Sequence, residues 1–220
     1  DFHPMSEQNG TLWIGDNNLM ASVNSSATFT ASGLLDLVDP QRIKALAPFD
    51  IDLVIGTIIA TSVNECKIAR WDTVLTTLQF NEPVRENGVN SFGWLGTVLI
   101  ANCGTSGNLY QYDGRFLQPY KRIPGTWSPT QRAEIYPSAM AVLRGNLIFG
   151  LSNLAGNPAE QGVYTIGRYS KDYPWVLTGP DLIVSLDVVA AVEIGAIVVD
   201  GQDVYVSSTD GTNFRIDQLN

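Results

Sequence analysis

Charged residues are scarce in this chain, because only 16% of its 220 residues are Asp, Glu, Lys or Arg, whereas globular proteins average roughly 25%. Basic residues are the scarcer kind, with 13 Lys and Arg against 22 Asp and Glu and a net charge of −9. Since nucleic-acid binding depends on clustered Lys and Arg, we expect no nucleic-acid partner. No apolar run reaches the roughly 18 residues of a membrane helix, so we also expect no membrane insertion.

Histidine and cysteine are rare as well. His3 is the only histidine, and the two cysteines, Cys66 and Cys103, lack metal-ligand spacing. We therefore expect no cofactor and no metal site, and free thiols are favoured over a disulfide bridge. A Ser-His-Asp or Cys-His arrangement would have to use His3 near a chain terminus, where chains are often mobile. This composition favours a protein that is not an enzyme.

Glycine and proline, in contrast, number 20 and 11, which suits many short strands joined by turns. Five apolar runs end in a small or turn-forming residue, and their fourth positions are spaced by 41, 45, 49 and 49 residues. This is the spacing of β-propeller blades. The runs are residues 12–16, 53–57, 98–102, 147–151 and 196–200.

A second repeated feature follows each run, where a short segment ends in a residue that can close a tight turn. Side chains of Asn, Asp and Ser bond the backbone about two residues further on, which stabilises such turns. We predict structural turn roles for five residues of this kind: Asn24, Asp72, Asp113, Ser170 and Asp210.

Short apolar segments before the runs complete the pattern. They are small enough for the innermost strand of a blade, and lie at 43–46, 89–92, 138–142 and 188–192. Outermost strands are predicted at 29–37, 77–84, 116–123, 175–183 and 214–219.

The fold class that these features predict is all-β, a five-bladed β-propeller with four antiparallel strands per blade. We expect a single domain, residues 1–220, whose approximate blades are 1–40, 41–86, 87–134, 135–184 and 185–220. Stacking blades around an axis buries faces that no unit could bury alone. The rival interpretation, a two-sheet sandwich, predicts no such period.

One segment has a further resemblance. Residues 208–214, Ser-Thr-Asp-Gly-Thr-Asn-Phe, resemble the Asp-box of sialidase-type propellers. That motif is a structural turn between the third and fourth strands of a blade, remote from the sialidase active site. The resemblance therefore supports the fold and implies no activity.

The acidic residues could form two other kinds of site. A five-bladed glycoside hydrolase would need two or three carboxylates about 5–10 Å apart at one mouth of the channel. Calcium could instead bind among Asp72, Asp113 or Asp210, which are already explained as turn residues. The carboxylates available to a hydrolase are Asp50, Asp52, Glu134, Asp187 and Glu193.

Aromatic residues suggest contacts with a partner. Trp94 lies in Phe-Gly-Trp-Leu-Gly, at a predicted turn, and Trp127 in Pro-Gly-Thr-Trp-Ser-Pro, a predicted loop. Exposed aromatics flanked by Gly and Pro suit sugar stacking or docking against a protein. Trp13, Trp71 and Tyr112 fall in predicted strands, where packing between blades is the favoured role.

The repeat as a whole resembles the propeller repeats of virion proteins of tailed bacteriophages, in residues 3–5, 12–23, 53–57 and 70–73. This resemblance implies a structural or binding component of the tail or capsid, for subunit assembly or host-surface contact. Its partners would be other virion proteins, or else a host-surface glycan or receptor. The main alternative is a carbohydrate-binding propeller lectin.

The location that we expect follows from the same resemblance. The chain begins at Asp1 and has no signal-peptide pattern, which agrees with a virion protein assembled in the host cytoplasm. An extracellular protein is the alternative. A processed product, an excised domain and part of a longer chain all remain open.

Overall fold

Every regular element that the computed structural model describes is a β-strand. No helix able to span a membrane is found among these residues. The described residues are 3–24, 26, 29–30, 35, 37, 41–59, 65–86, 88–103, 108–122, 140–151, 162–168, 177–185, 193–209 and 212–219.

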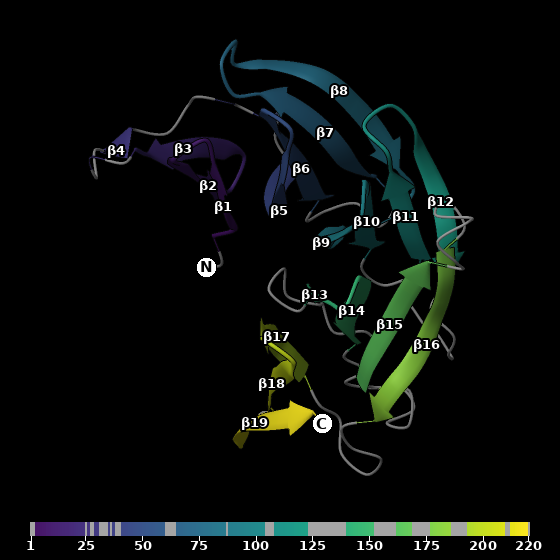
Figure 1. The fold of residues 1–220 in the computed structure, drawn as a ribbon. Helices are drawn as coiled ribbons and strands as arrows, with labels where there is room; N and C mark the ends of the chain where they lie inside the picture. The colour runs from purple at the N-terminus through teal and green to yellow at the C-terminus, as the bar shows by residue number, and fades with distance from the viewer. Residues whose placement is uncertain are drawn as a thin grey trace. The chain divides into compact units, whose positions relative to one another are not determined.

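The chain divides into two compact units, Asp1–Phe92 and Gly93–Asn220. The first unit holds two four-stranded antiparallel sheets, whose strands follow one another in chain order (Figure 1). The first sheet consists of β1 (Met5–Gln8), β2 (Thr11–Asp16), β3 (Leu19–Val23) and β4 (Phe29–Thr30). The second sheet consists of β5 (Gln41–Phe49), β6 (Asp52–Ile59), β7 (Cys66–Asp72) and β8 (Thr77–Val84).

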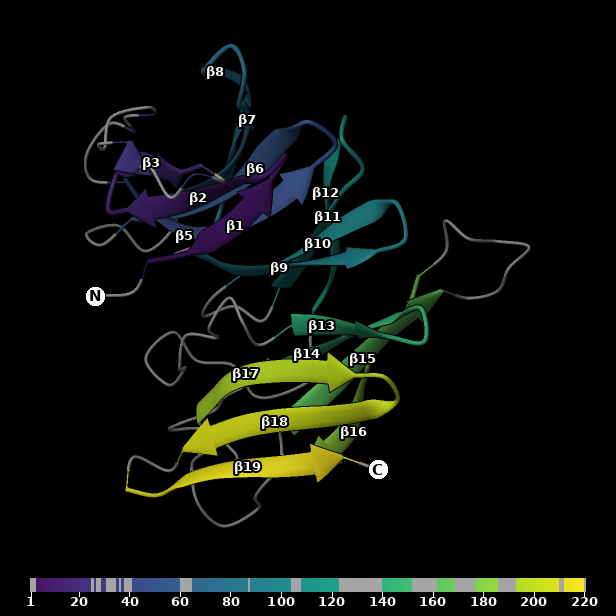
Figure 2. The same cartoon turned by 60° about the vertical axis from the view of Figure 1, so that its left-hand side comes forward.

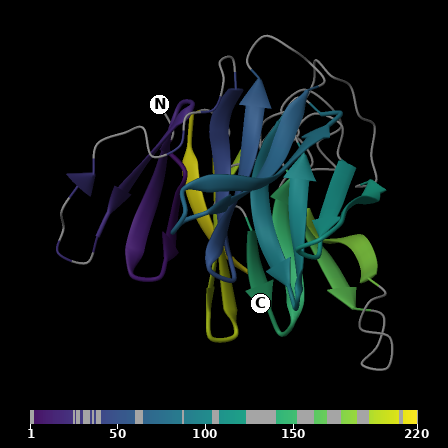
Figure 3. The same ribbon diagram turned by 90° about the horizontal axis from the view of Figure 1, so that it is seen from above.

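Three more sheets follow, again with their strands in chain order. The third consists of β9 (Val89–Leu95), β10 (Val98–Cys103), β11 (Asn108–Tyr112) and β12 (Leu117–Arg122). The fourth consists of β13 (Met140–Leu143), β14 (Asn146–Leu151), β15 (Gly162–Arg168) and β16 (Leu177–Ser185). The fifth has three strands, β17 (Glu193–Asp200), β18 (Asp203–Thr209) and β19 (Phe214–Leu219) (Figures 2 and 3).

The predicted five-bladed propeller with four strands in every blade is wrong in this form. The described residues form five separate sheets, of which the fifth has three strands. Between these sheets the described residues show one isolated bridge, from Ile58 of β6 to Gly88, which directly precedes β9. The sequence period reports how often an antiparallel unit recurs, and neither the number of strands in each unit nor ring closure follows from it. The prediction of a single domain with the blade bounds given above stays a prediction.

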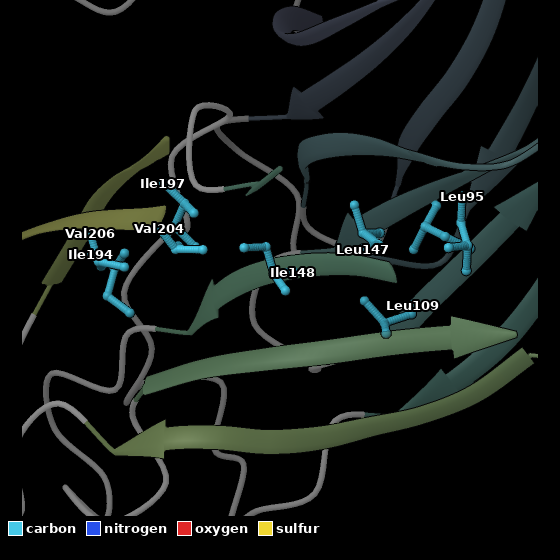
Figure 4. Packing of buried hydrophobic residues seen from close by; sticks show 9 residues of the cluster. Leu95, Leu109, Leu147, Ile148, Ile194, Ile197, Val204 and Val206 are labelled. Atoms are coloured by element: carbon cyan, nitrogen blue, oxygen red, sulfur yellow. The ribbon is translucent and has the colours of Figure 1, made fainter. Parts of the chain in front are cut away.

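Each unit has a hydrophobic core between its sheets. In the first unit, Trp13 and Trp71 meet edge to face with ring centroids 5.0 Å apart, within a cluster that also contains Met20, Leu53 and Ile55. In the second unit, the fourth and fifth sheets supply most of the cluster (Figure 4). Its buried members are Leu95, Ile100, Leu109, Leu147, Ile148, Ile194, Ile197, Val204 and Val206.

Glycine on a second strand lets the next sheet approach closely. A Cβ atom on Gly15 of β2 would lie 2.6 Å from Ile43 of β5. The same 2.6 Å separates a Cβ on Gly56 of β6 from Val89 of β9. In the second unit, a Cβ atom on Gly150 of β14 would likewise lie 2.6 Å from Ile194 of β17. In all three contacts, a β-branched residue on the first strand of a sheet occupies the space that a side chain on the preceding sheet would need.

This packing corrects the strand assignment of the fifth sheet, whose apolar run was predicted as a second strand. β17 contacts β13 and β14 as β5 contacts β1 and β2, so β17 is the first strand of its sheet. The positions of β-bulges support this assignment. β5 has a bulge directly before Ala45, which pairs with Gly56. β17 has one directly before Ala196, which pairs with Ser207. The predicted innermost segment, 188–192, lies outside the described residues.

Candidate functional site: an apolar patch on two linked turns

Asp72 ends β7 and organises the turn that follows. Its Oδ1 atom accepts hydrogen bonds from the backbone N–H groups of Val74 and Leu75, both at 2.8 Å. Its Oδ2 atom accepts one from Nε2 of Gln79 at 2.9 Å. Asp72 is buried beneath the turn, and its carboxylate satisfies two donors that would otherwise need water. The geometry is that of a structural turn residue.

The next residue links this turn to a second one. The Thr73 hydroxyl donates a hydrogen bond to the carbonyl oxygen of Ile51, 2.9 Å away, in the β5–β6 turn. Three aliphatic side chains project from these two turns into solvent: Val74 is 74% exposed, Leu75 68% and Ile51 52%. We call Ile51, Val74 and Leu75 the turn patch.

An ion pair supports the β5–β6 turn from below. Nε of Arg70 lies 2.5 Å from Oδ2 of Asp52, whose side chain is buried. The Arg70 guanidinium also stacks on the ring of Phe49, 4.9 Å from its centroid. A planar cation between a carboxylate and an aromatic face is held in one orientation. Both turns that carry the turn patch are therefore braced by polar contacts to the strands.

Asp113 organises the corresponding turn of the third sheet. Its Oδ1 atom accepts hydrogen bonds from the backbone N–H groups of Arg115, at 2.8 Å, and Phe116, at 2.7 Å. Asn24 accepts one such hydrogen bond, from the backbone N–H of Ser26 to its Oδ1 atom at 3.0 Å. The two other predicted turn residues, Ser170 and Asp210, lie outside the described residues.

These backbone hydrogen bonds affect the two aspartates electrostatically. The bond from the Leu75 N–H is the largest cause lowering the pKa of Asp72, with smaller contributions from Val74, Gln79 and Arg70. The bond from the Phe116 N–H is the largest cause lowering the pKa of Asp113. Burial acts in the opposite direction in both cases. A carboxylate that accepts several N–H groups is stabilised in its charged form.

The predicted aromatic contacts are placed differently from the turn patch. Trp94 lies within β9 rather than at a turn, and its side chain is partly buried. Trp127 lies outside the described residues. Trp13, Trp71 and Tyr112 are buried, as expected of packing residues.

The candidate catalytic carboxylates are not brought together as a described site. Asp52 forms the ion pair with Arg70, and Asp50 has a left-handed backbone with φ of 56°. Glu193 lies in β17, whereas Glu134 and Asp187 lie outside the described residues. His3 places its Nδ1 atom 3.3 Å from the Gly15 carbonyl oxygen and 3.6 Å from Oδ1 of Asp16.

The two cysteines are free and buried. Burial is the main cause that raises the pKa of the Cys66 thiol to about 12, and the nearby Glu86 carboxylate adds to it. A thiol with so high a pKa is protonated and unreactive at neutral pH. Among the described residues, no group of three or more His, Cys, Asp or Glu side chains could hold a metal ion.

Sequence reasoning predicted the residue that organises the turn patch but not the patch. The signal was present, because Val74 and Leu75 directly follow a predicted turn aspartate, and Ile51 stands between two aspartates. Aliphatic residues in a tight turn have few buried neighbours, so their exposure could have been anticipated. The link between the two turns depends on strand pairing and is not visible in the sequence.

Comparison with known proteins finds similarity in structure alone, since no family model and no curated relative matches the chain. A structure described as a mitotic checkpoint complex matches with a TM-score of 0.61 and 13% identity, over 98% of this chain and 65% of the other. A luciferin-regenerating enzyme matches with a TM-score of 0.56 and 14% identity, over 94% of this chain and 68% of the other. The extracellular domain of a hybrid two-component system from B. thetaiotaomicron matches with a TM-score of 0.59 and 15% identity, over 97% of this chain and 27% of the other.

These similarities concern the fold alone, because all three identities are far below the level at which function is shared. They support a repeat protein of propeller-like fold in the coarse sense. The chain spans about two thirds of the first of these structures. The described geometry offers an exposed aliphatic patch on a braced support, an arrangement suited to contact with another macromolecule.

Proposed function

We propose that this chain is a non-enzymatic structural or binding module of a tailed-bacteriophage virion, in its tail or on its capsid. The turn patch would contact a neighbouring virion protein. The observation that carries the proposal is the exposure of Ile51, Val74 and Leu75 on two turns braced by Asp72 and Thr73. The assignment to a virion rests on the resemblance of the sequence repeat to those of phage virion proteins.

The chemistry of the turn patch favours a protein over a glycan. Its three side chains are aliphatic, whereas sugar rings stack on the flat faces of Trp, Tyr and Phe. Fixed aliphatic groups instead contribute by excluding water against an apolar surface of similar shape. Because the two turns are already held together, little conformational entropy is lost when a partner binds.

The proposal can be tested on the material from which the chain is isolated. Native mass spectrometry and negative-stain imaging should find the chain in stoichiometric copies on tailed particles. A photo-crosslinking residue at position 75 should then capture one virion protein, whereas the same residue at exposed Asn146 should not. A chain found free of particles would overturn the virion role. Equal crosslinking at both positions would overturn the role of the turn patch.

A glycan array distinguishes the lectin alternative. We expect no saturable binding of any glycan class by the unmodified chain. Saturable binding of one glycan class, unaffected by Leu75→Glu, would favour the lectin and place its site elsewhere on the chain.

A further inference from the structure

The β5–β6 turn is held by side chains at three consecutive residues. The carbonyl oxygen of Asp50 accepts a hydrogen bond from Nε2 of Gln8. The carbonyl oxygen of Ile51 accepts one from the Thr73 hydroxyl, and the carboxylate of the residue that follows accepts one from Nε of Arg70. Arg70 lies in β7 and Thr73 directly after it, whereas Gln8 is the last residue of β1 in the first sheet. One support of this turn therefore comes from the neighbouring sheet of the same unit.

Gln8 occupies a buried position, with 7% of its surface exposed, on the side of β1 that also buries Ser6. Successive side chains of a strand alternate between two faces, and the packed face favours apolar groups, because a buried amide is costly unless it is hydrogen-bonded. The bond to the Asp50 carbonyl oxygen, 42 residues further along the chain, provides that hydrogen bond. The contact therefore explains why a polar residue stands at this buried position.

The backbone of Asp50 is the part of the turn that most needs support. Phe49 pairs with Asp52, so Asp50 and Ile51 alone connect the two strands. Asp50 has a φ of 56°, in the left-handed region that residues with a Cβ atom adopt at a steric cost, and such a conformation persists where surrounding contacts fix it. Because the peptide unit is planar, a bond that fixes the Asp50 carbonyl group also fixes the direction in which the chain enters Ile51.

A contact of the same kind occurs in the second unit. Arg144 lies in the β13–β14 turn, and its Nε donates a hydrogen bond to Oε1 of Gln202 in the β17–β18 turn at 2.6 Å. In both units, a side chain in or directly before the first turn of one sheet contacts the first turn of the next sheet. The second residue of the receiving turn differs, since Gln202 is polar and Ile51 is aliphatic. In the first unit, the contact therefore supports a turn that presents an apolar side chain.

We propose that Gln8 is a positioning residue of the turn patch, so that partner binding at the turn patch depends on a hydrogen bond from the first sheet. Gln8 is buried and acts through the Asp50 carbonyl group rather than by touching the partner. This inference rests on the proposed function of the turn patch. It adds that the contact surface is complete only when the first and second sheets are packed together.

The size of the effect follows from how often Ile51 adopts the orientation that binds. When only a fraction of a protein is competent to bind, its apparent Kd is raised in inverse proportion to that fraction. Loss of the Gln8 bond should lower the competent fraction, and partner affinity should fall by about 3- to 10-fold, the effect of a single hydrogen bond. The positions of Val74 and Leu75 should change less, because Asp72 and Thr73 still hold their turn.

Nuclear magnetic resonance of the full chain tests the positioning role without a partner. Gln8→Met removes the donor while nearly preserving the volume of the side chain. The Cδ1 methyl signal of Ile51 should shift and its relaxation should show greater motion, whereas the methyl signals of Val74 and Leu75 should change less. Gln41→Met is the matched control, because it makes the same substitution at the far end of β5 from the turn, and it should leave the Ile51 signal unchanged.

Photo-crosslinking then tests the consequence for binding. Chains with the crosslinking residue at position 75 are mixed, over a range of concentrations, with the proteins of dissociated tailed particles. Half-maximal capture should need about 3- to 10-fold more of the Gln8→Met chain than of the unmodified or Gln41→Met chain. Gln8→Asn retains an amide on a shorter side chain that cannot span the same distance, so it should give the same two results. Circular dichroism should show that every variant is folded.

The possible results separate this inference from the proposed function. An unchanged Ile51 signal in folded Gln8→Met would overturn the positioning role. A shifted Ile51 signal with unchanged capture would show that the orientation of Ile51 does not control binding, which overturns the inference and leaves the proposed function standing. Absence of capture by the unmodified chain would instead overturn the role of the turn patch, and the inference with it.

Discussion

The hydroxyl of Thr73 and the carbonyl oxygen of Ile51 lie 2.9 Å apart and join the β7–β8 turn to the β5–β6 turn. This contact makes one surface from two turns that are separated in the sequence. Because Val74 and Leu75 follow Thr73 directly, the link also determines where their exposed side chains are presented. The turn patch is therefore a tertiary feature built on a local one.

Replacing Thr73 by Val should weaken this link while preserving shape and β propensity. A net hydrogen bond is worth about 1 kcal/mol, and less where water can replace it, so the free energy of unfolding should fall by up to about 1 kcal/mol. Urea denaturation measures the loss, with Thr77→Val on β8 as the control. Crosslinking through position 75 should become less selective. An unchanged crosslinking pattern would show that the link does not position the turn patch.

Acid should destabilise the fold through the turn aspartates. The pKa of Asp72 is lower in the folded chain than in the unfolded one, mainly because of the Leu75 N–H, so folding favours its charged form. The stabilisation is complete above the unfolded pKa of about 3.9. It is lost as the pH falls through the lower folded pKa.

Asp72→Asn tests this dependence, because the amide retains an acceptor oxygen but cannot titrate. The curve of unfolding free energy against pH should be shallower below pH 4, about the unfolded carboxyl pKa, than it is for the unmodified chain. Asp113→Asn should act in the same direction with a smaller effect, since Asp113 accepts two of these hydrogen bonds and Asp72 three. Asp203→Asn, at an exposed residue, is the control. Parallel curves would contradict the prediction.

Arg70→Leu should be strongly destabilising, because it leaves the buried carboxylate of Asp52 without its cation. Breaking a buried ion pair from one side typically costs about 3–5 kcal/mol. The double variant Asp52→Leu with Arg70→Leu should recover much of that loss, since no buried charge remains. Denaturant unfolding of the two single variants and the double variant measures the coupling. A double variant as unstable as Arg70→Leu would show that the orientation of Arg70 matters more than charge compensation.

Cys66 should resist alkylation in the native state. Its thiol has a pKa of about 12, chiefly because it is buried, and the thiolate is the reactive form. A Cys103→Ser variant isolates Cys66, and its reaction with a colorimetric disulfide reagent at mild alkaline pH should be negligible until denaturant is added. Rapid reaction in the folded chain would show that the start of β7, at Cys66, opens readily.

Much of the strand content follows from local chemistry. The apolar runs at 12–16, 53–57, 98–102 and 147–151 all lie in second strands, because short continuous apolar runs bounded by turn residues favour strands buried on both faces. The turn roles of Asp72 and Asp113 follow in the same way, since an aspartate bonds backbone groups only two or three residues away. Both depend on interactions short enough to be encoded by neighbouring residues.

The fifth sheet shows why the rest could not be predicted. Its apolar run, 196–200, resembles the other four runs, but Ile194 packs on Gly150 and makes β17 a first strand. Nothing local distinguishes a first strand from a second, because both are apolar and both end in a tight turn. The predicted uniform propeller depended on that distinction.

The amino-acid sequence by itself determined the recurrence of antiparallel units and the residues that close their turns, since the units follow from short apolar runs and the turns from short-range hydrogen bonds. Burial depends on which sheet lies against which. Ile68 and Ile216 are the same residue type on equivalent strands, and only tertiary packing buries the one and leaves the other in solvent.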